Sequence, residues 1–312
     1  MDQFLKEVLH DLNTTPKTLN SKYFYDGKGD KIFQEIMDCP EYYPTNCEME
    51  IFRDYAKELA LTLRNGFNNF DLVEMGAGDA TKSSHLLKEL VEMKADFTYM
   101  PIDISSAMIS HLEEVLPKQI EGLHVHGLNG EYFQMLDQAN KISSRKKVVM
   151  ILGGNIGNVD PEGALVFCSK IRSCLQEGDL VLLGFDLKKN PRTVLAAYND
   201  AGGFTRDFNL NLLHRINNEL DGNFDTEQFE HYPTYDPATG ACKSYLISRI
   251  NQQVEIAGNS FTFSENEFIF MEISQKYSIE ETDNIAEKTG FKPVEHFLDH
   301  KKWFLDTVWQ CI

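Results

Sequence analysis

A regular alternation of apolar runs and amphipathic stretches between Phe70 and Leu187 is the feature that most constrains the fold of this chain. The apolar runs are FDLVEMG, FTYMPID, LHVHGL, KKVVMILGG and DLVLLGFDL. Stretches with helical spacing, such as KSSHLLKELVEM and SSAMISHLEEVL, separate them. Strands that alternate with helices in this way are typical of parallel β–α–β units, in which each helix crosses back over the sheet. The sequence therefore predicts an α/β protein with a doubly wound sheet.

A second region interrupts this alternation after Leu187. The next stretch has helical spacing, and the turn residues Asp236-Pro237 and Gly240 then indicate a hairpin. The capping-box pair Ser278 and Glu281 predicts a return to the sheet through one more helix, and KKWFLDTVWQCI predicts a last strand. We therefore expect a sheet domain that is interrupted by a second region from residue 188 to residue 275, after which the chain returns to finish the sheet.

Charge and composition limit the class of partner. The chain has 30 basic and 48 acidic residues and a formal net charge of -18, which disfavours phosphate backbones and anionic membranes. No run approaches the roughly 20 apolar residues that span a bilayer, and the charged N-terminal residues do not form a secretory signal. Six scattered cysteines form neither a CxxC motif nor a Cys/His cluster, so we expect no metal site. The working expectation is a cytoplasmic monomer that binds neither nucleic acid nor membrane.

The motif VEMGAGDATK follows the first strand of the predicted sheet. Gly76 and Gly78 allow a tight turn at which a ligand can approach the backbone, but Thr81 stands where a dinucleotide fingerprint has its third glycine. Asp103 ends the second strand, where a carboxylate can accept both hydroxyls of a ribose. Together with Glu74, this pattern is typical of S-adenosylmethionine methyltransferases. Other nucleotide-binding sheets remain an alternative.

Two further motifs admit both a structural and a functional interpretation. The stretch GGNIGNVDP, residues 153–161, follows the fourth strand, at the sheet edge where open parallel sheets bind ligands. It is either an ordinary glycine-rich turn or a site where an amide side chain grips a carboxylate. Four tyrosines near prolines, in YFYDGKGDKIFQEI and CPEYYPTNCEMEIF, either pack or stabilise a cationic ligand.

The stretch EFIFMEISQKYS predicts a buried strand with two polar interruptions. Glu272 and Ser274 point to the same face, because alternate side chains of a strand do so. The simplest interpretation is a solvated face. The other interpretation is a binding site.

These motifs, in this order, resemble the histidine-specific N-alpha-methyltransferases of ergothioneine biosynthesis over nearly the whole chain. The resemblance rests on FYDGKGDKIFQEIMDCPEYYPTNCE, EMGAGDATK, YMPIDIS, ILGGNIGNVDP, LLGFDLKK, AAYNDAGG, FNLNLLHRINNEL and MEISQKY. It implies a class I methyltransferase sheet, with a second, smaller domain built from the N-terminus and an insertion. Residues 51–187 and 276–312 would then form the cofactor-binding sheet domain, and residues 1–50 and 188–275 the substrate-binding domain. It also implies transfer of methyl groups from S-adenosylmethionine to the α-amine of L-histidine, up to the trimethylated betaine hercynine, with S-adenosylhomocysteine as product.

The resemblance also implies roles for individual residues. The cofactor would be held by Tyr25, Gly76, Lys82, Asp103, Gly130, Glu131 and Tyr132, where Glu131 replaces the family's Asp. The substrate would be held by Tyr42, Asn158 and Tyr198 at its carboxylate, by Glu272 and Ser274 at its imidazole, and by Phe33 along the pocket. Tyr25 as a proton route and Gly153 near the amine would be the catalytic residues.

One departure from the family's pattern leaves other substrates as alternatives to histidine. Ser244 stands where the family usually has a Met near the imidazole, so another amino acid or small amine is an alternative. A protein or peptide N-methyltransferase and a non-catalytic sensor of adenosine ligands are further alternatives.

Overall fold

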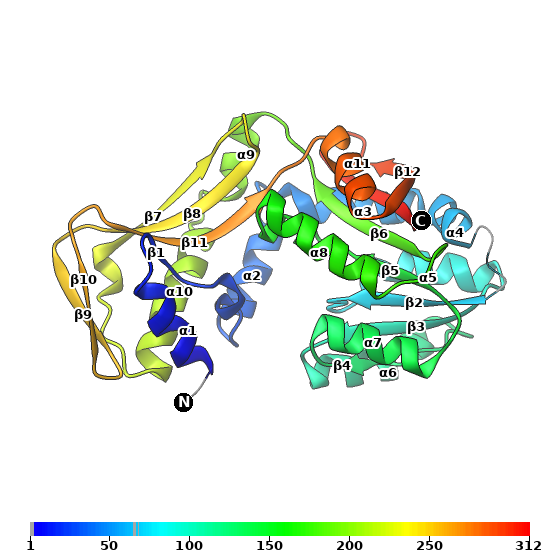
Figure 1. Ribbon diagram of the computed structural model, residues 1–312, viewed down its shortest axis with the longest axis horizontal. Coiled ribbons are helices and arrows are strands. Elements are labelled where there is room, and N and C mark those ends of the chain that lie inside the picture. Colours follow the sequence, from blue (N-terminus) through cyan, green and yellow to red (C-terminus); the bar gives the residue numbers. More distant parts are fainter. Residues whose placement is uncertain (1–2, 65–66, 68) are drawn as a thin grey trace. The chain divides into compact units, whose positions relative to one another are not determined.

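The computed structural model describes residues 3–64, 67 and 69–312, and it divides the chain into two compact units (Figure 1). One unit consists of Met1–Tyr43 and Lys189–Gln275, and the other of Pro44–Lys188 and Lys276–Ile312. The first boundary lies at residues 43 and 44, where the sequence analysis set it at 50 and 51. We call these parts the insertion unit and the sheet unit.

The sheet unit is built on a mixed sheet of seven strands. These are β2 (Asn69–Met75), β3 (Asp96–Asp103), β4 (Leu128–Asn129), β5 (Lys146–Ile151), β6 (Leu180–Asp186), β12 (Phe291–Leu298) and β13 (Phe304–Cys311), in the order β12-β13-β6-β5-β2-β3-β4. The strands β4, β3, β2, β5 and β6 pair in parallel, and β13 is antiparallel to both β6 and β12. The carboxyl ends of β2, β3 and β5 therefore meet at one edge of the sheet.

Helices precede and connect the strands of this sheet. They are α3 (Tyr43–Asp54), α4 (Ala56–Arg64), α5 (Ser83–Glu92), α6 (Ser106–Gln119), α7 (Tyr132–Ile142), the 3-10 helix η2 (Asn155–Asn158), α8 (Pro161–Ser173) and α11 (Ile279–Lys288). Buried residues of α7, α8 and α11 pack with β2, β5 and β6 in one apolar core that includes Leu136, Cys168 and Ala286. Burial of that apolar surface is the main stabilising contribution to the unit.

Two expectations for this sheet need correction. The run LHVHGL forms a strand only at its end, in β4, and otherwise contributes one isolated bridge between Val125 and Tyr99. Strand β12 was not expected, because Pro293 and the charged residues of FKPVEHFL do not read as a sheet strand. An edge strand tolerates both, since one side of its backbone has no partner.

The insertion unit combines helices with a mainly antiparallel sheet, whose first strand pairs in parallel. Its helices are α1 (Gln3–Leu12), η1 (Ser21–Phe24), α2 (Gly29–Asp38), α9 (Pro191–Ala197), α10 (Phe204–Glu219) and η3 (Thr226–Gln228). Its strands are β1 (Lys17–Thr18), β7 (Phe229–Tyr235), β8 (Ala241–Ser248), β9 (Gln252–Ile256), β10 (Asn259–Phe263) and β11 (Phe268–Gln275). Four of them form the sheet β1-β11-β8-β7, and β9 pairs with β10.

A register shift in β11 decides which way its polar residues point. Ile269 pairs with Leu246 and Glu272 pairs with Ser244, but the register shifts between Phe270 and Glu272. Residues that lie directly opposite each other in an antiparallel pair share a face. Glu272 therefore lies on the same face as Ile269, which is the face of the fully buried Leu246.

The predicted return to the sheet is confirmed at its first residues. The Ser278 side chain accepts a hydrogen bond from the Glu281 backbone, and the Glu281 carboxylate accepts one from the Ser278 backbone, which forms the expected capping box. No helix in the described part of the chain combines the length and the apolar character that a bilayer crossing requires.

Candidate active site

The glycine turn after β2 is shaped for close approach. Gly76 and Gly78 have φ values of +75° and +52°, a region that favours glycine. A side chain at Gly76 would lie 2.6 Å from the Tyr132 hydroxyl, whereas one at Gly78 would meet no atom within 4 Å. The turn thus brings Tyr132 against Gly76 and leaves open space beside Gly78.

Glu74 stabilises this turn through hydrogen bonds to neighbouring elements. Its carboxylate accepts hydrogen bonds of 2.6 Å from the Ser83 and Tyr99 hydroxyls, and the side chain is buried. Burial raises the pKa of Glu74 to about 7, although both hydrogen bonds favour the ionised form. Because both oxygens are engaged, Glu74 anchors α5 and β3 to β2.

Five of the residues expected at the cofactor lie together at the carboxyl ends of β2 and β3. Asp103 pairs with Asn129 in register, and its backbone carbonyl accepts a hydrogen bond from the Gly130 amide. Burial raises the pKa of Tyr132, and the negative charges of Asp103 and Glu131 raise it further. The half-buried Asp103 carboxylate and the open space beside Gly78 fit a ligand that carries ribose hydroxyls.

Lys82 and Gly153 also lie close to each other in the sheet unit. A side chain on Gly153 would lie 3.9 Å from the Lys82 Nζ atom, and Gly153 has a φ of +76°. The Lys82 ammonium forms an ion pair with Glu48, and the Gly153 amide donates to the same carboxylate. Asn158 ends η2 and is exposed.

Tyr25, expected at the cofactor, and the residues expected around the substrate form a chain of contacts in the insertion unit. Tyr25 packs edge-on against Phe33, Phe33 against Tyr42, and Tyr42 against Tyr198, with ring centroids 5.5, 6.4 and 6.3 Å apart. The Tyr198 hydroxyl then forms a hydrogen bond of 2.7 Å with the Ser274 hydroxyl. Segments far apart in sequence are thus brought into one aromatic wall.

The carboxylate of Glu272 lies beside this wall. Asn209 of α10 donates a hydrogen bond of 3.3 Å to Glu272 Oε1, and Ser244 is the cross-strand partner of Glu272. Asn209 and Ser244 are almost completely buried, at 0% and 1% exposure. Glu272 therefore does not lie on a solvated face.

Three residues of these sites were not singled out from the sequence. Phe208 contacts the rings of both Tyr25 and Phe33, Asn209 donates to Glu272, and Glu48 holds Lys82. A polar residue at a core-facing helix position is the signal that could have indicated Asn209 and Glu48. Phe208 carries no such signal, because apolar residues in a helix usually serve packing.

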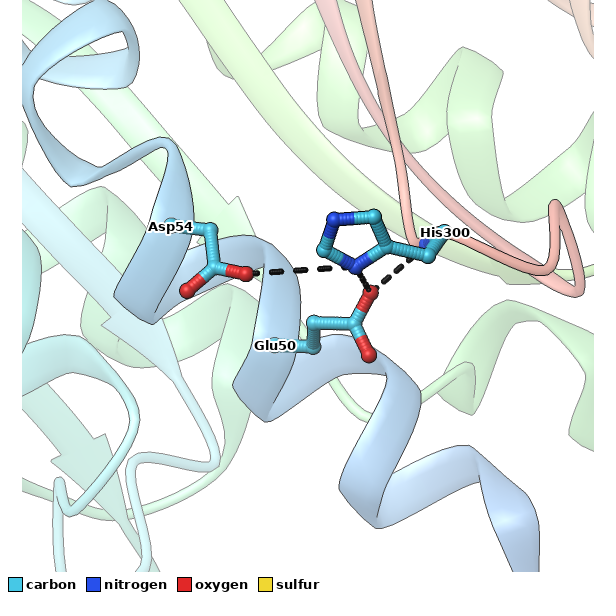
Figure 2. Close-up of side chains that lie close together, drawn as sticks. All are labelled: Glu50, Asp54 and His300. Atoms are coloured by element: carbon cyan, nitrogen blue, oxygen red, sulfur yellow. Dashed lines mark hydrogen bonds and ion pairs between the residues drawn. The ribbon is translucent and has the colours of Figure 1, made fainter.

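A cluster of potential metal ligands lies on the sheet unit, where the sequence predicted none (Figure 2). Glu50 and Asp54 point from α3 towards His300, and their ligand atoms lie within 4.8 Å of one another. These groups already satisfy one another, because Glu50 contacts the His300 ring and the Arg53 guanidinium holds both Asp54 oxygens.

A cavity of about 680 Å³ on the sheet unit includes His300 but none of the expected site residues. It is lined by α4 residues such as Leu61 and by residues of β12 such as Phe297. The expected chemistry lies at the carboxyl ends of β2, β3 and β5, so this cavity is not the candidate active site.

The sheet and its edge define a class of enzyme. Class I S-adenosylmethionine-dependent methyltransferases have a seven-stranded sheet in which the last strand runs antiparallel beside the fifth, a glycine turn after the first strand and an acid after the second. The chain has each of these in β13 and β6, in Gly76 and in Asp103, and it is an S-adenosylmethionine-dependent methyltransferase of this class.

Comparison with known proteins narrows the class to a family. Residues 4–311 match the model of the histidine-specific, S-adenosylmethionine-dependent methyltransferases, and the chain belongs to this family. It is 31% identical over 274 residues to a histidine N-alpha-methyltransferase of Mycobacterium tuberculosis, which covers 87% of this chain and 84% of the relative. The corresponding enzyme of Mycolicibacterium smegmatis is 29% identical over 94% of this chain and 90% of its own.

A more distant relative is named for a different amino acid. The L-tryptophan methyltransferase of Psilocybe serbica is 25% identical over 309 residues, which is 91% of this chain and 86% of that protein.

Proposed function

We propose that this methyltransferase transfers methyl groups to the α-amine of L-histidine, up to the trimethylated betaine. The observation that carries the proposal is the position of Glu272 and Ser274 on the buried face of β11, with Asn209 and Tyr198 as their partners. A carboxylate accepts an imidazole N–H, and a hydroxyl can pair with the other ring nitrogen. Buried polar groups left unpaired by a ligand without these nitrogens would weaken its binding.

The family assignment and the edge of the sheet support the cofactor roles. Asp103 would accept the ribose hydroxyls, and Glu131 and Tyr132 would lie near the adenine. The other residues of the cofactor site would be Gly76, Gly130 and Lys82. When bound, S-adenosylmethionine supplies an activated methyl group, so the enzyme needs no strong general base.

The chain's own residues then bind and orient the amino acid. Tyr42 and Tyr198 would hold its carboxylate, and their packing in the aromatic wall fixes both rings. Positioning of this kind can contribute several kcal/mol to catalysis, on the order of the effects measured for oriented intramolecular reactions. The amine must lose a proton before it attacks, and the hydroxyl of Tyr25, an exposed residue, is the proposed route for it. The roles expected for Gly153 at the amine and Asn158 at the carboxylate remain predictions.

A second candidate substrate class follows from Ser244. This small, buried side chain lies directly opposite Glu272, where the family usually has a Met. Less volume at that position would admit a larger ring, and the relative from Psilocybe serbica is named for tryptophan. Another amino acid is therefore the alternative to histidine.

Calorimetric titration of the common amino acids, with S-adenosylhomocysteine present, separates the two candidates. We expect histidine to bind most tightly and Glu272→Ala to weaken histidine binding by about tenfold or more, because a charge-assisted hydrogen bond is lost. Binding of S-adenosylhomocysteine should change less than twofold in the same variant. Preference for an amino acid without an imidazole, or equal losses for both ligands, would contradict the assignment.

We further propose that the enzyme acts as a cytoplasmic monomer without nucleic-acid partners. The net charge of -18 supports the last point, since phosphate backbones repel such a surface. Sedimentation at micromolar concentration checks the oligomeric state against the monomer mass of 35.7 kDa.

A further inference from the structure

Two buried ionisable side chains and one half-buried one, from separate elements, lie together within the sheet unit next to the glycine turns. Glu48 comes from α3, Lys82 from the start of α5 and Asp306 from β13. Glu48 and Asp306 have 0% exposure. Buried charges are expensive unless they are paired, so such a cluster calls for an explanation.

Glu48 is engaged through both carboxylate oxygens. Oε2 forms the ion pair with the Lys82 ammonium, and Oε1 accepts a hydrogen bond of 2.7 Å from the Gly153 amide. One side chain thus connects the segment after the first glycine turn with the turn after β5. A charged acceptor makes both hydrogen bonds stronger than a neutral one would.

Asp306 lies on the other side of the same carboxylate. Both of its oxygens are buried and have no hydrogen-bond partner in the described part of the chain. A side chain at Gly184 would lie 2.6 Å from Glu48 Oε1 and 3.2 Å from Asp306 Oδ1, so the two carboxyl groups approach each other over this glycine. Burial and the charge of Glu48 raise the pKa of Asp306 well above its usual range.

We propose that Glu48 is a positioning residue for cofactor binding, which holds the Lys82 ammonium and the Gly153 amide in place. This inference rests on the proposed roles of Lys82 at the cofactor and of Gly153 at the amine.

A double-mutant cycle with S-adenosylhomocysteine as the calorimetric probe tests this role. Glu48→Gln keeps an acceptor for the Gly153 amide but removes the charge that holds Lys82, and it should weaken binding by about tenfold. Lys82→Gln should weaken binding at least as much. The double variant should bind within twofold of Lys82→Gln alone, because Glu48 acts through Lys82.

Glu50→Gln is the matched control, since Glu50 lies on the same helix and points to His300 instead. It should bind S-adenosylhomocysteine like the wild type. If Glu48→Gln alone fails to fold, the comparison of the double variant with Lys82→Gln still decides, because neither protein contains an unpaired Lys82 ammonium.

Unchanged binding in Glu48→Gln, or losses that multiply in the double variant, would overturn the inference. Failure of the wild type to bind S-adenosylhomocysteine would instead contradict the proposed function.

Discussion

At the scale of single residues, the proposed imidazole site depends on Asn209. Its side-chain amide donates to Glu272 and to the Thr205 carbonyl, so it links the strand carboxylate to α10. Because Asn209 is buried, water cannot replace it without entering the core.

We predict that Asn209→Leu lowers the affinity for histidine by about tenfold, since Glu272 loses a donor that orients it. Calorimetry with histidine measures this change. Glu219→Gln, on the same helix but at its exposed end, should leave the affinity unchanged. An Asn209→Leu protein that is folded and binds histidine like the wild type would show that Glu272 needs no partner.

Asp306 makes the stability of the fold depend on pH. Its pKa is higher in the folded protein than in the unfolded chain, because burial and Glu48 raise it while Lys82 only partly lowers it. The folded state therefore holds the proton more tightly, and the stability gained below the unfolded pKa is lost as pH rises through the folded pKa.

We predict that Asp306→Asn removes this loss, because the amide has no proton to release. Urea denaturation between about pH 5 and 9, which lies above the ordinary pKa of an aspartate, should show a shallower decline in the variant, with a difference of at most ~1.4 kcal/mol per pH unit. Asp137→Asn, which changes an exposed residue of α7, serves as the control. Parallel curves for Asp306→Asn and the wild type would mean that Asp306 does not titrate in this way.

The residue scale also shows how far sequence reasoning reaches. Alternation placed Glu272 and Ser274 on one face, and the structure confirms it. Alternation could not identify Asn209 or Glu48 as site residues, because their hydrogen-bond partners lie 63 and 34 residues away along the chain. Contacts of that separation depend on how the helices pack, which a local pattern does not encode.

At the scale of elements, local sequence patterns predicted those features of the fold that depend on neighbouring residues. The capping box at Ser278 was predictable, since its two residues are three positions apart and satisfy each other. The register of β11 was not, because a shift of one residue exchanges the two faces of a strand. Sequence alone therefore predicted that Glu272 and Ser274 share a face of the strand. It did not predict whether that face points to the core.

We predict that Ser278→Ala destabilises the protein by about 1 kcal/mol, because the first turn of α11 loses its N-cap acceptor. The midpoint of urea denaturation measures the change. Ser84→Ala, at an exposed site in α5, should have a smaller effect. No difference between the two variants would indicate that the α11 cap is dispensable.

At the scale of the whole molecule, the chain crosses between its two units three times, after Tyr43, Lys188 and Gln275. The last two crossings were visible as breaks in the strand–helix alternation. The first lies at the start of α3, and no composition change marks it, because helices precede and follow it.

This division makes a prediction for ligand protection. Hydrogen exchange followed by mass spectrometry should show that S-adenosylhomocysteine protects amides around Gly76, Asp103 and Gly130 in the sheet unit. Histidine should protect amides around Asn209 and Glu272 in the insertion unit, since binding slows local opening. Histidine protection confined to the sheet unit would contradict the proposed assignment of roles.

The most direct test of the central claim is mass spectrometry of the products formed from histidine and S-adenosylmethionine. We predict that mono-, di- and trimethylated histidine appear in succession, together with S-adenosylhomocysteine, and that the Glu272→Ala protein forms them far more slowly. Methylation of another amino acid in preference to histidine, or no methylated histidine from a protein that binds S-adenosylhomocysteine, would contradict the account.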